Sequence, residues 1–349
     1  MTALETTTEA VGPVVRARSP LRVSFGGGGT DVSPYCDERG GAVLSATIDR
    51  YAYATLEPGG DRIVVDSVDY DVSLSYSLDE EFVYDGQLDL AKAVIDHMRR
   101  EHGLASGMRI RLHNDAPPGS GLGSSSAIVV ALLGALAHYL GLRMDPYELA
   151  ERAFTIERVD AGIKGGRQDQ YATAFGGFNF IEFDPGATVV TPLRLRPEVL
   201  YELEYGLVFA YVGGQHFSSH IIERQSRNFE TGEAGAVAAM DRIKELADDM
   251  RRALLLGHLR DFGALMDEGW REKKRMAEGI TNARIDEVYA TAREAGALGG
   301  KISGAGGGGF MFFICDPSRR FAVQDALKRL DAELVNFSFV QEGMRSWTV

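Results

Sequence analysis

The sequence predicts an α+β protein built from two domains. Its 349 residues exceed what one ordinary hydrophobic core encloses, which indicates two domains of moderate size. Segments with the period of two expected of half-buried strands alternate along the chain with segments of helical periodicity. A content of 45% hydrophobic and 25% charged residues is typical of a soluble globular protein.

The first half is predicted to form strands and helices on both sides of a glycine-rich loop. Hydrophobic patterns predict strands over residues 14–25, 41–58, 61–76, 107–115 and 176–183, and helices over 88–103, 127–140 and 145–159. Gly103 suits the C-cap of the first helix, and Asp145 with Pro146 suits the start of the third. The helix over 127–140 is apolar on most sides, so we expect it to be buried.

The second half continues the alternation after a loop-rich stretch. Pro185, Pro192 and Pro197 fall in this stretch, and we place the domain boundary there. The predicted units are a disordered tail over 1–15, an N-terminal domain over 16–190 and a C-terminal domain over 191–349. Within the last unit, strands are predicted over 201–212, 309–316 and 333–340, and helical segments over 235–278, 283–296 and 318–332.

Charge and cysteine content exclude several classes of protein. A formal net charge of −13 argues against nucleic acid or anionic lipid as a partner, so any anion must be bound by local backbone amides and a few placed cations. Cys36 and Cys315 offer neither a disulfide framework nor metal-ligand spacing, which favours free thiols in a reducing cytosol. We see neither a membrane-spanning run nor a signal-peptide pattern, and therefore expect a cytoplasmic protein. The oligomeric state stays open, with a homodimer among the options.

One loop carries the chemistry of a phosphate-binding site. It reads PPGSGLGSSS and leads directly into the apolar helix. A helix N-terminus offers unpaired amides and partial positive charge, and glycines let a phosphate approach them closely. No lysine is present, so this is not the common P-loop, and a merely flexible capping loop is the alternative. The predicted ATP-binding residues are Pro118, Gly119, Ser120, Gly121, Leu122, Gly123, Ser124, Ser125 and Ser126.

Three ordered motifs resemble those of the GHMP kinases. They are RSPLRVSFGGGGTD over 18–31, PPGSGLGSSSA over 117–127 and KISGAGGGGF over 301–310. The last contains a literal G-x-G-x-x-G, but it precedes a predicted strand and so is not read as a dinucleotide site. The resemblance implies the family fold: an N-terminal domain like ribosomal protein S5 domain 2, and a C-terminal ferredoxin-like domain, with ATP between them.

Longer stretches narrow the resemblance to the D-glycero-D-manno-heptose 7-phosphate kinases. These stretches lie over residues 25–54, 163–183 and 296–313. The resemblance implies transfer of the ATP γ-phosphate to the anomeric C1 hydroxyl of a heptose 7-phosphate, giving the 1,7-bisphosphate used to make nucleotide-activated heptose. The implied substrates and cofactors are thus a sugar phosphate, ATP and Mg²⁺.

The motifs assign roles to four residues by position. Asp169 matches the catalytic carboxylate, which accepts the proton of the sugar hydroxyl or orients that hydroxyl. Arg22 matches the basic residue that neutralises phosphate charge or lowers the pKa of Asp169. Ser125 and Glu157 match the Mg²⁺ ligands. Three of these residues also have a plain alternative: a helix cap for Asp169, a strand-surface cation for Arg22 and a solvated carboxylate for Glu157.

A second group of residues is predicted to bind the acceptor. Asp31 suits a pair of sugar hydroxyls, with turn-capping as its alternative role. The phosphate of the substrate requires cations, for which Lys164, Arg167 and Lys301 are the preferred candidates. Lys273 and Lys274 are weaker candidates, because residues 271–275 read as a solvated helix face. The remaining predicted substrate contacts are Gly28, Gly29, Thr30, Gly304, Gly306 and Gly307.

Two other functions stay compatible with these motifs. One is a kinase acting on another anomeric sugar, such as fucose or galactose. The other is a non-catalytic sensor of sugar or nucleotide, which the intact Ser125, Glu157 and Asp169 disfavour. His216 and His220 stand four apart, but they lack a third metal ligand nearby.

Overall fold

A computed structural model of the chain describes residues 12–214 and 218–349. Strand β1 (Val15–Gly26) begins close to the first described residue. The predicted disordered tail therefore falls, up to residue 11, outside the described residues. Among the described residues, no helix combines the length and the hydrophobicity that crossing a lipid bilayer requires.

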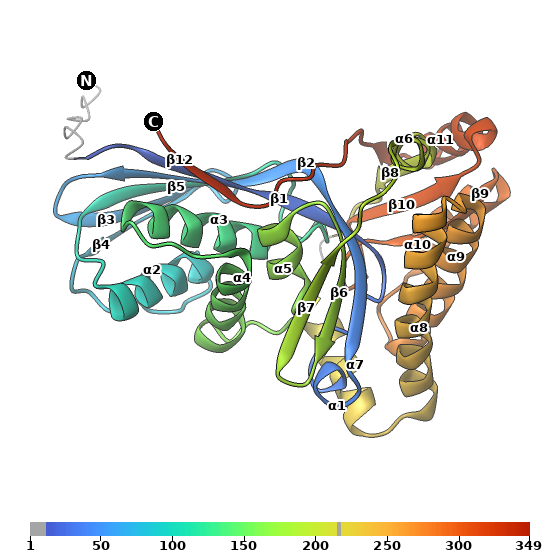
Figure 1. Cartoon of the computed structure of the whole chain (residues 1–349), viewed down its shortest axis with the longest axis horizontal. Coiled ribbons are helices and arrows are strands. Elements are labelled where there is room, and N and C mark those ends of the chain that lie inside the picture. Colours follow the sequence, from blue (N-terminus) through green and yellow to red (C-terminus); the bar gives the residue numbers. More distant parts are fainter. Residues whose placement is uncertain (1–11, 215–217) are drawn as a thin grey trace.

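The N-terminal half, together with the last strand of the chain, forms a large mixed sheet, and helices cover one face of this sheet (Figure 1). The sheet has the order β12-β1-β2-β5-β3-β4, and β6 pairs with β2 and with β7. All of these pairs are antiparallel except β3 with β5, which is parallel. The strands are β2 (Gly41–Pro58), β3 (Arg62–Ser67), β4 (Val72–Ser77), β5 (Met108–Asn114), β6 (Phe178–Asp184), β7 (Ala187–Pro192) and β12 (Arg345–Thr348).

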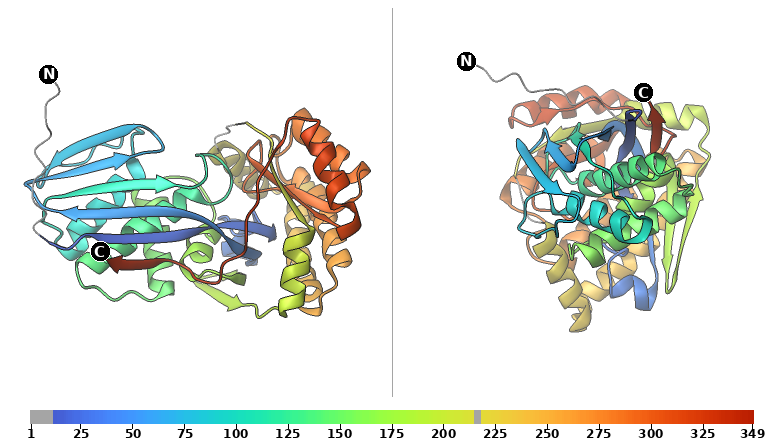
Figure 2. Two further views of the ribbon diagram at one scale, coloured as in Figure 1. Left: turned by 90° about the horizontal axis from the view of Figure 1, so that it is seen from above. Right: turned by 90° about the vertical axis from the view of Figure 1, so that its left-hand side faces the viewer.

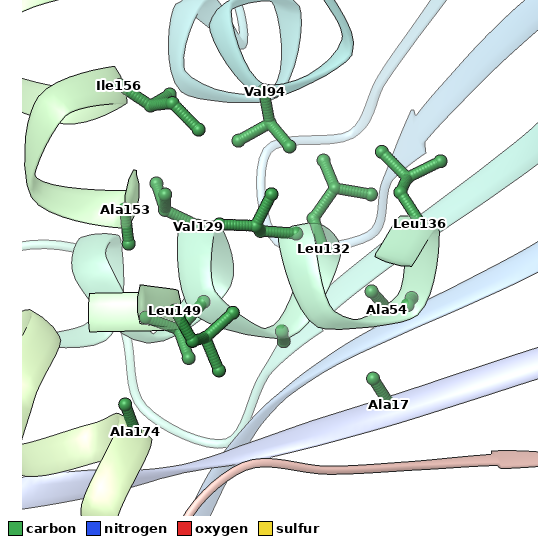
Figure 3. Close-up of a cluster of buried hydrophobic side chains, with 14 of the residues drawn as sticks. Ala17, Ala54, Val94, Val129, Leu132, Leu136, Leu149, Ala153, Ile156 and Ala174 are labelled. Atoms are coloured by element: carbon green, nitrogen blue, oxygen red, sulfur yellow. The ribbon is translucent and has the colours of Figure 1, made fainter. Parts of the chain in front are cut away.

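Helix α3 (Ser124–Tyr139) lies at the centre of the N-terminal core, as its apolar sequence predicts. Figure 3 shows Val129 and Leu132 between Val94 of a covering helix and Ala54 and Ala17 of the sheet. Most side chains between Ala127 and Ala137 are buried, which explains why the helix shows almost no polar face. The other helices of this half are α1 (Tyr35–Arg39), α2 (Asp89–His102), α4 (Pro146–Thr155) and α5 (Gln168–Phe175).

The C-terminal half contains a second, fully antiparallel sheet of order β11-β8-β10-β9. Counted along the chain this order is 4-1-3-2, the ferredoxin-like arrangement that the resemblance implies. The α+β fold class is thereby confirmed. The strands are β8 (Leu207–Tyr211), β9 (Ala297–Ile302), β10 (Phe310–Cys315) and β11 (Glu333–Leu334); the helices are α6 (Pro197–Gly206), α7 (Ser218–Glu230), α8 (Ala234–Leu256), α9 (Leu259–Met276), α10 (Ala283–Glu294) and α11 (Arg320–Lys328).

The end of the chain returns from the second sheet to the first (Figure 2). The Val340 amide donates to the Thr47 carbonyl at 3.0 Å, and Phe339 forms an isolated bridge with Ile48. Further on, β12 pairs with β1, and a Cβ placed on Gly134 of α3 would lie 2.5 Å from Met344 Cε. We predicted residues 191–349 as one domain, but its final segment completes the N-terminal sheet.

Several predicted elements differ from the observed ones. Residues 201–206 belong to helix α6, not to a strand, because Pro197 opens a helix that the strand pattern obscures. The strand predicted over 333–340 is observed only as the short strand β11. The helical segment predicted over 235–278 consists of two helices, α8 and α9, which are separated at Gly257, whose φ is +78°. Strands β7 and β9 were not predicted, and β9 contains two consecutive glycines that conceal its pattern.

Leu132→Ala is expected to destabilise the N-terminal half strongly. Leu132 has no exposed surface, so the substitution leaves a cavity that costs about 2–5 kcal/mol in the free energy of unfolding. Urea unfolding followed by circular dichroism measures the loss. Leu256→Ala is the matched control, because Leu256 is 61% exposed at the end of α8 and should change stability by less than about 0.5 kcal/mol. Equal effects of the two variants would contradict the packing described here.

Candidate active site

The predicted phosphate loop sits at the N-terminus of α3. Gly119, Gly121 and Gly123 all have φ between +74° and +80°, a region that favours glycine. Gly123 is the N-cap residue, and no side chain caps the helix. The first amides of α3 are therefore left for another acceptor, and together with the helix dipole they suit a phosphate.

The third glycine motif packs directly on the phosphate loop. Ser303 Oγ donates to the Gly121 carbonyl at 2.8 Å, and the Phe310 amide donates to the Ser120 carbonyl at 3.1 Å. A Cβ on Gly304 would lie 2.9 Å from Gly121 Cα, and one on Gly121 would lie 2.4 Å from the Ser303 carbonyl oxygen. Only glycines permit this contact between the two halves of the protein.

Gly306 and Gly307 have a related role. A Cβ on Gly306 would lie 2.6 Å from the Ile280 carbonyl oxygen, to which the Gly307 amide donates at 3.0 Å. These contacts explain why the loop is rich in glycine. The predicted contacts of Gly304, Gly306 and Gly307 with substrate stay predictions.

Arg22 and Asp169 form an ion pair beneath the phosphate loop. Arg22 Nε donates to Asp169 Oδ1 at 2.6 Å, and its Nη1 donates to the Gly121 carbonyl at 2.6 Å. A Cβ on Gly123 would lie 3.4 Å from both Arg22 Cγ and Asp169 Cγ. The guanidinium is almost fully buried, whereas the carboxylate stays partly exposed. A basic and an acidic group are thus held together next to the expected position of the phosphates.

Asp31 is buried and contacts Gln168, the residue before Asp169. Its carboxylate accepts from the Gly29 amide at 2.9 Å and from the backbone and side-chain nitrogens of Gln168, both at 3.1 Å. It therefore joins the first motif to the start of α5. Thr30 is fully buried, and its hydroxyl bonds the backbone at Gly27 and Ala42. These backbone hydrogen bonds already give the Thr30 hydroxyl partners within the loop. Contact of Thr30 with a sugar stays a prediction.

Glu157 lies in a π-helical turn (Ile156–Asp160) and meets the first turn of α3. Its Oε2 accepts from Ser126 Oγ at 2.7 Å and from Gln170 Nε2 at 2.5 Å, and its Oε1 pairs with Arg158 Nη1 at 3.1 Å. The carboxylate is buried, so the alternative of a solvated surface group is wrong. Ser125 is exposed, and the serine hydroxyl in contact with Glu157 belongs to Ser126.

The three predicted phosphate-binding cations have separate surroundings in the structure. Lys301 is buried, and its Nζ donates to the Ser24 carbonyl at 2.8 Å. Arg167 pairs with Asp37 at 3.1 Å and lies over the Phe154 ring, whereas Lys164 is exposed. Among the described residues these three cations share no direct contact, so their joint grip on one phosphate stays a prediction.

Lys273 was assigned to a solvated helix face, and this is wrong. It is 5% exposed, and its Nζ donates weakly to the Gly28 carbonyl at 3.4 Å. Burial lowers its pKa to about 8, with Asp31 opposing and Arg22 adding to the effect. Burial, together with Lys273 and Arg22, also holds the pKa of Lys301 well below its usual value.

The sequence does contain a signal for the burial of Lys273. The buried apolar side chains of α9 are Phe262, Met266, Trp270 and Met276, and Lys273 falls in the same stripe at helical spacing. The neighbouring Lys274 points away, 3.3 Å from Asp286. A lysine within an apolar stripe is a candidate for a functional cation.

The paired histidines offer no metal site in the part of the chain that is described. His220 lies on α7, 3.7 Å from Glu223, and His216 lies outside the described residues. Among the described residues no group of three or more histidine, cysteine, aspartate or glutamate side chains could hold a metal ion by itself.

Comparisons with known proteins define the class to which this site belongs. Residues 89–177 match the GHMP kinases N-terminal domain, and residues 250–332 match the GHMP kinases C-terminal domain. The chain is 38% identical to D-glycero-alpha-D-manno-heptose 7-phosphate kinase of Campylobacter jejuni, an alignment covering 96% of this chain and 99% of the relative. The chain belongs to the GHMP kinase family, whose members use ATP as phosphoryl donor.

Solved structures agree with this placement. The structure of a D-glycero-D-manno-heptose 1-phosphate kinase from Bacteroides thetaiotaomicron superposes with a TM-score of 0.81 at 37% identity, covering 96% of this chain and 99% of that one. Galactokinase of Lactococcus lactis, with a TM-score of 0.74 at 18% identity and 95% coverage of each chain, shares the fold.

Asp169→Asn is expected to keep ATP affinity and to lose most of kcat. The amide cannot accept the proton of the attacking hydroxyl, a loss of about 10²–10⁴-fold where such a group acts in proton transfer. Steady-state ADP release and nucleotide titration measure the two quantities. Asp66→Asn is the control, because it removes a different carboxylate, which on β3 forms an ion pair with Arg109 on β5. Turnover near the wild-type level in Asp169→Asn would remove this residue from catalysis.

Lys273→Met is expected to stabilise the protein at neutral pH. The folded state releases the Lys273 proton near pH 8, whereas an unfolded chain holds it to about pH 10.5. Between these values the unfolded state binds more protons, so stability rises with pH; below pH 8 the buried charge costs up to about 3 kcal/mol.

The expected gain in Tm of Lys273→Met at pH 7 should therefore shrink towards pH 10, as measured by thermal unfolding across this range. Lys274→Met is the matched control, because Lys274 is one-third exposed on the same helix. A Lys273→Met protein less stable than the wild type at pH 7 would contradict this assignment.

Proposed function

We propose that the protein transfers the γ-phosphate of ATP to the anomeric C1 hydroxyl of D-glycero-D-manno-heptose 7-phosphate. The Arg22–Asp169 pair carries this proposal, because it lies against the phosphate loop at Gly121 and Gly123. Phosphoryl transfer requires chiefly positioning and charge neutralisation, and both are available at this point.

The described side chains suggest a division of labour. The first amides of α3 hold the phosphates of ATP, and Arg22 neutralises charge that develops on the transferred group. Asp169 orients the attacking hydroxyl and receives its proton. The ion pair with Arg22 holds the carboxylate in place beside the phosphate loop.

Mg²⁺ would be held at this site by the Glu157 carboxylate and one serine hydroxyl as protein ligands. Glu157 presents a buried carboxylate to the first turn of α3, where Ser125 and Ser126 supply hydroxyl oxygens. Mg²⁺ prefers oxygen ligands, and at kinase sites it takes most of its coordination from water and phosphate. When bound, the ion would neutralise charge on the phosphates of ATP.

The relatives support a heptose phosphate as acceptor, although their names differ. The Campylobacter relative is named a 7-phosphate kinase and the Bacteroides structure a 1-phosphate kinase. A C1 kinase uses the 7-phosphate as substrate and leaves a phosphate on C1. Buried Lys273, whose pKa is lowered only to about 8, adds a cation near Arg22 at neutral pH, which favours an anionic acceptor over a neutral sugar.

We further propose a cytoplasmic place in nucleotide-activated heptose synthesis. A kinase for free fucose or galactose and a non-catalytic sensor are the competing functions. Asp169 paired with Arg22, together with Glu157 adjacent to α3, disfavours the sensor, because a binding protein requires neither.

The test is ADP release with a panel of acceptors. We expect Mg²⁺-dependent turnover with heptose 7-phosphate, and at least about tenfold lower kcat/KM with mannose, galactose or fucose, since these lack the phosphate. Heptose 1-phosphate is the matched control, because its C1 oxygen is already blocked. Turnover of that compound would place the transfer at another hydroxyl, and tight ATP binding without turnover of any sugar would favour the sensor.

A further inference from the structure

Three buried side chains from three different elements form a closed triangle of hydrogen bonds. Glu157 Oε2 accepts from Ser126 Oγ at 2.7 Å and from Gln170 Nε2 at 2.5 Å, and Gln170 Nε2 also donates to Ser126 Oγ at 3.1 Å. Ser126 belongs to the first turn of α3, Glu157 to the π-helical turn and Gln170 to α5. None of the three is more than 2% exposed. Both amide hydrogens of Gln170 are therefore used within the triangle.

The two oxygens of the Glu157 carboxylate are held in different ways. Oε1 pairs with Arg158 Nη1 at 3.1 Å, but Arg158 lies next to Glu157 in the same turn and would move with it. Ser126 and Gln170, by contrast, fix the carboxylate relative to α3 and α5. Since Gln170 directly follows Asp169 in α5, its contact ties the carboxylate proposed for Mg²⁺ to the helix that carries the proposed catalytic carboxylate.

The first turn of α5 serves two partners at once. Neighbouring residues of a helix project about 100° apart. Asp169 turns to Arg22, whose Nε donates to its Oδ1 at 2.6 Å, and Gln170 turns to Glu157. This turn thus sets the separation between the two carboxylates. In phosphoryl transfer that separation governs how the metal and the attacking hydroxyl are placed about one phosphate.

Packing alone does not explain an amide at position 170. Gln170 is fully buried, and its Oε1 has no hydrogen-bond partner among the described residues. A buried polar atom without a partner is unfavourable, and a methionine would fill a similar volume without one. The two hydrogen bonds that Nε2 donates are what the amide offers and an apolar side chain lacks.

We infer that Gln170 is a positioning residue for the Mg²⁺ site, because its Nε2 sets the orientation of the Glu157 carboxylate from α5. Hydrogen bonds to a metal-binding carboxylate from residues that do not touch the metal orient that carboxylate, and their loss commonly costs about 10–100-fold in metal affinity. The motifs assign no role to Gln170. The inference rests on the proposed function, in which Glu157 holds the ion.

Gln170→Met is expected to weaken metal binding by about 10–100-fold. The probe is Mn²⁺, which accepts the same oxygen ligands as Mg²⁺. It is titrated into the enzyme saturated with a non-hydrolysable ATP analogue and followed by electron paramagnetic resonance. Affinity for the analogue without metal should stay within about threefold of the wild type, because the amides at the start of α3 are unchanged. Wild-type Mn²⁺ affinity in Gln170→Met would overturn the inference.

Asn179→Leu is the matched control, because Asn179 is also a buried amide with one unused oxygen. Its Nδ2 donates to the Gly176 carbonyl at 2.9 Å, and its Oδ1 has no partner among the described residues. It lies on β6, so its loss should leave Mn²⁺ affinity at the wild-type value. Equal losses in Asn179→Leu and Gln170→Met would show a general effect of removing a buried amide and would contradict the inference.

A second variant and a double substitution separate positioning from damage to the fold. Gln170→Asn keeps the amide but shortens the side chain by one methylene, so it should also weaken Mn²⁺ binding. In a Glu157→Gln protein, Gln170→Met should cost no more than about twofold further in Mn²⁺ affinity, because the two residues act through one contact. Full additivity of the two losses would exclude action through Glu157.

The outcomes separate this inference from the proposed function. The Mn²⁺ titration requires no acceptor, so an enzyme that shows these losses but turns over no sugar phosphate would refute the proposed acceptor and leave the inference standing. A Glu157→Gln protein that binds Mn²⁺ like the wild type would refute the proposed metal site, and the inference with it. Weakened binding in Glu157→Gln together with unchanged binding in Gln170→Met would refute the inference alone.

Discussion

The contact between two glycine loops is the constraint on which the site depends. Gly121 and Gly304 approach so closely that a Cβ on either would collide with the other loop. The phosphate loop belongs to the N-terminal half and the second loop to the ferredoxin-like half, so this contact fixes the two halves relative to each other at the point where phosphate is held. Arg22 binds the same loop, since its Nη1 donates to the Gly121 carbonyl. A side chain at Gly121 or Gly304 would disturb the loop and the ion pair beneath it together.

Much of the fold and of the pairing at the centre of the site could be predicted from the sequence. The apolar helix α3 follows from periodicity, whereas the ferredoxin-like sheet and the proximity of Arg22 to Asp169 are implied by the family resemblance. What could not be predicted depends on tertiary contacts. Ser126 meets Glu157 because the π-helical turn directs that carboxylate to one side of the first turn of α3, and no sequence pattern encodes such a turn.

Positive charge is concentrated inside a protein whose surface is strongly acidic. Arg22, Lys273 and Lys301 are all buried, and each ammonium is made less basic by its loss of water and by the other cations. Such an arrangement is unfavourable for stability, yet it prepares the site for the negative charge of nucleotide and acceptor before either arrives. Binding of an anion would relieve the unfavourable interactions among these basic groups.

The return of the chain to its first sheet has a consequence for biosynthesis. Strand β1 has β12 as one neighbour, and Gly134 of α3 packs on Met344. Both partners are translated only after the entire ferredoxin-like half. As the ribosome elongates the chain, the N-terminal half must wait with one strand edge unpaired and part of its central helix uncovered. The pairing of β1 and the packing of α3 in this half are therefore completed only by the last residues to be synthesised.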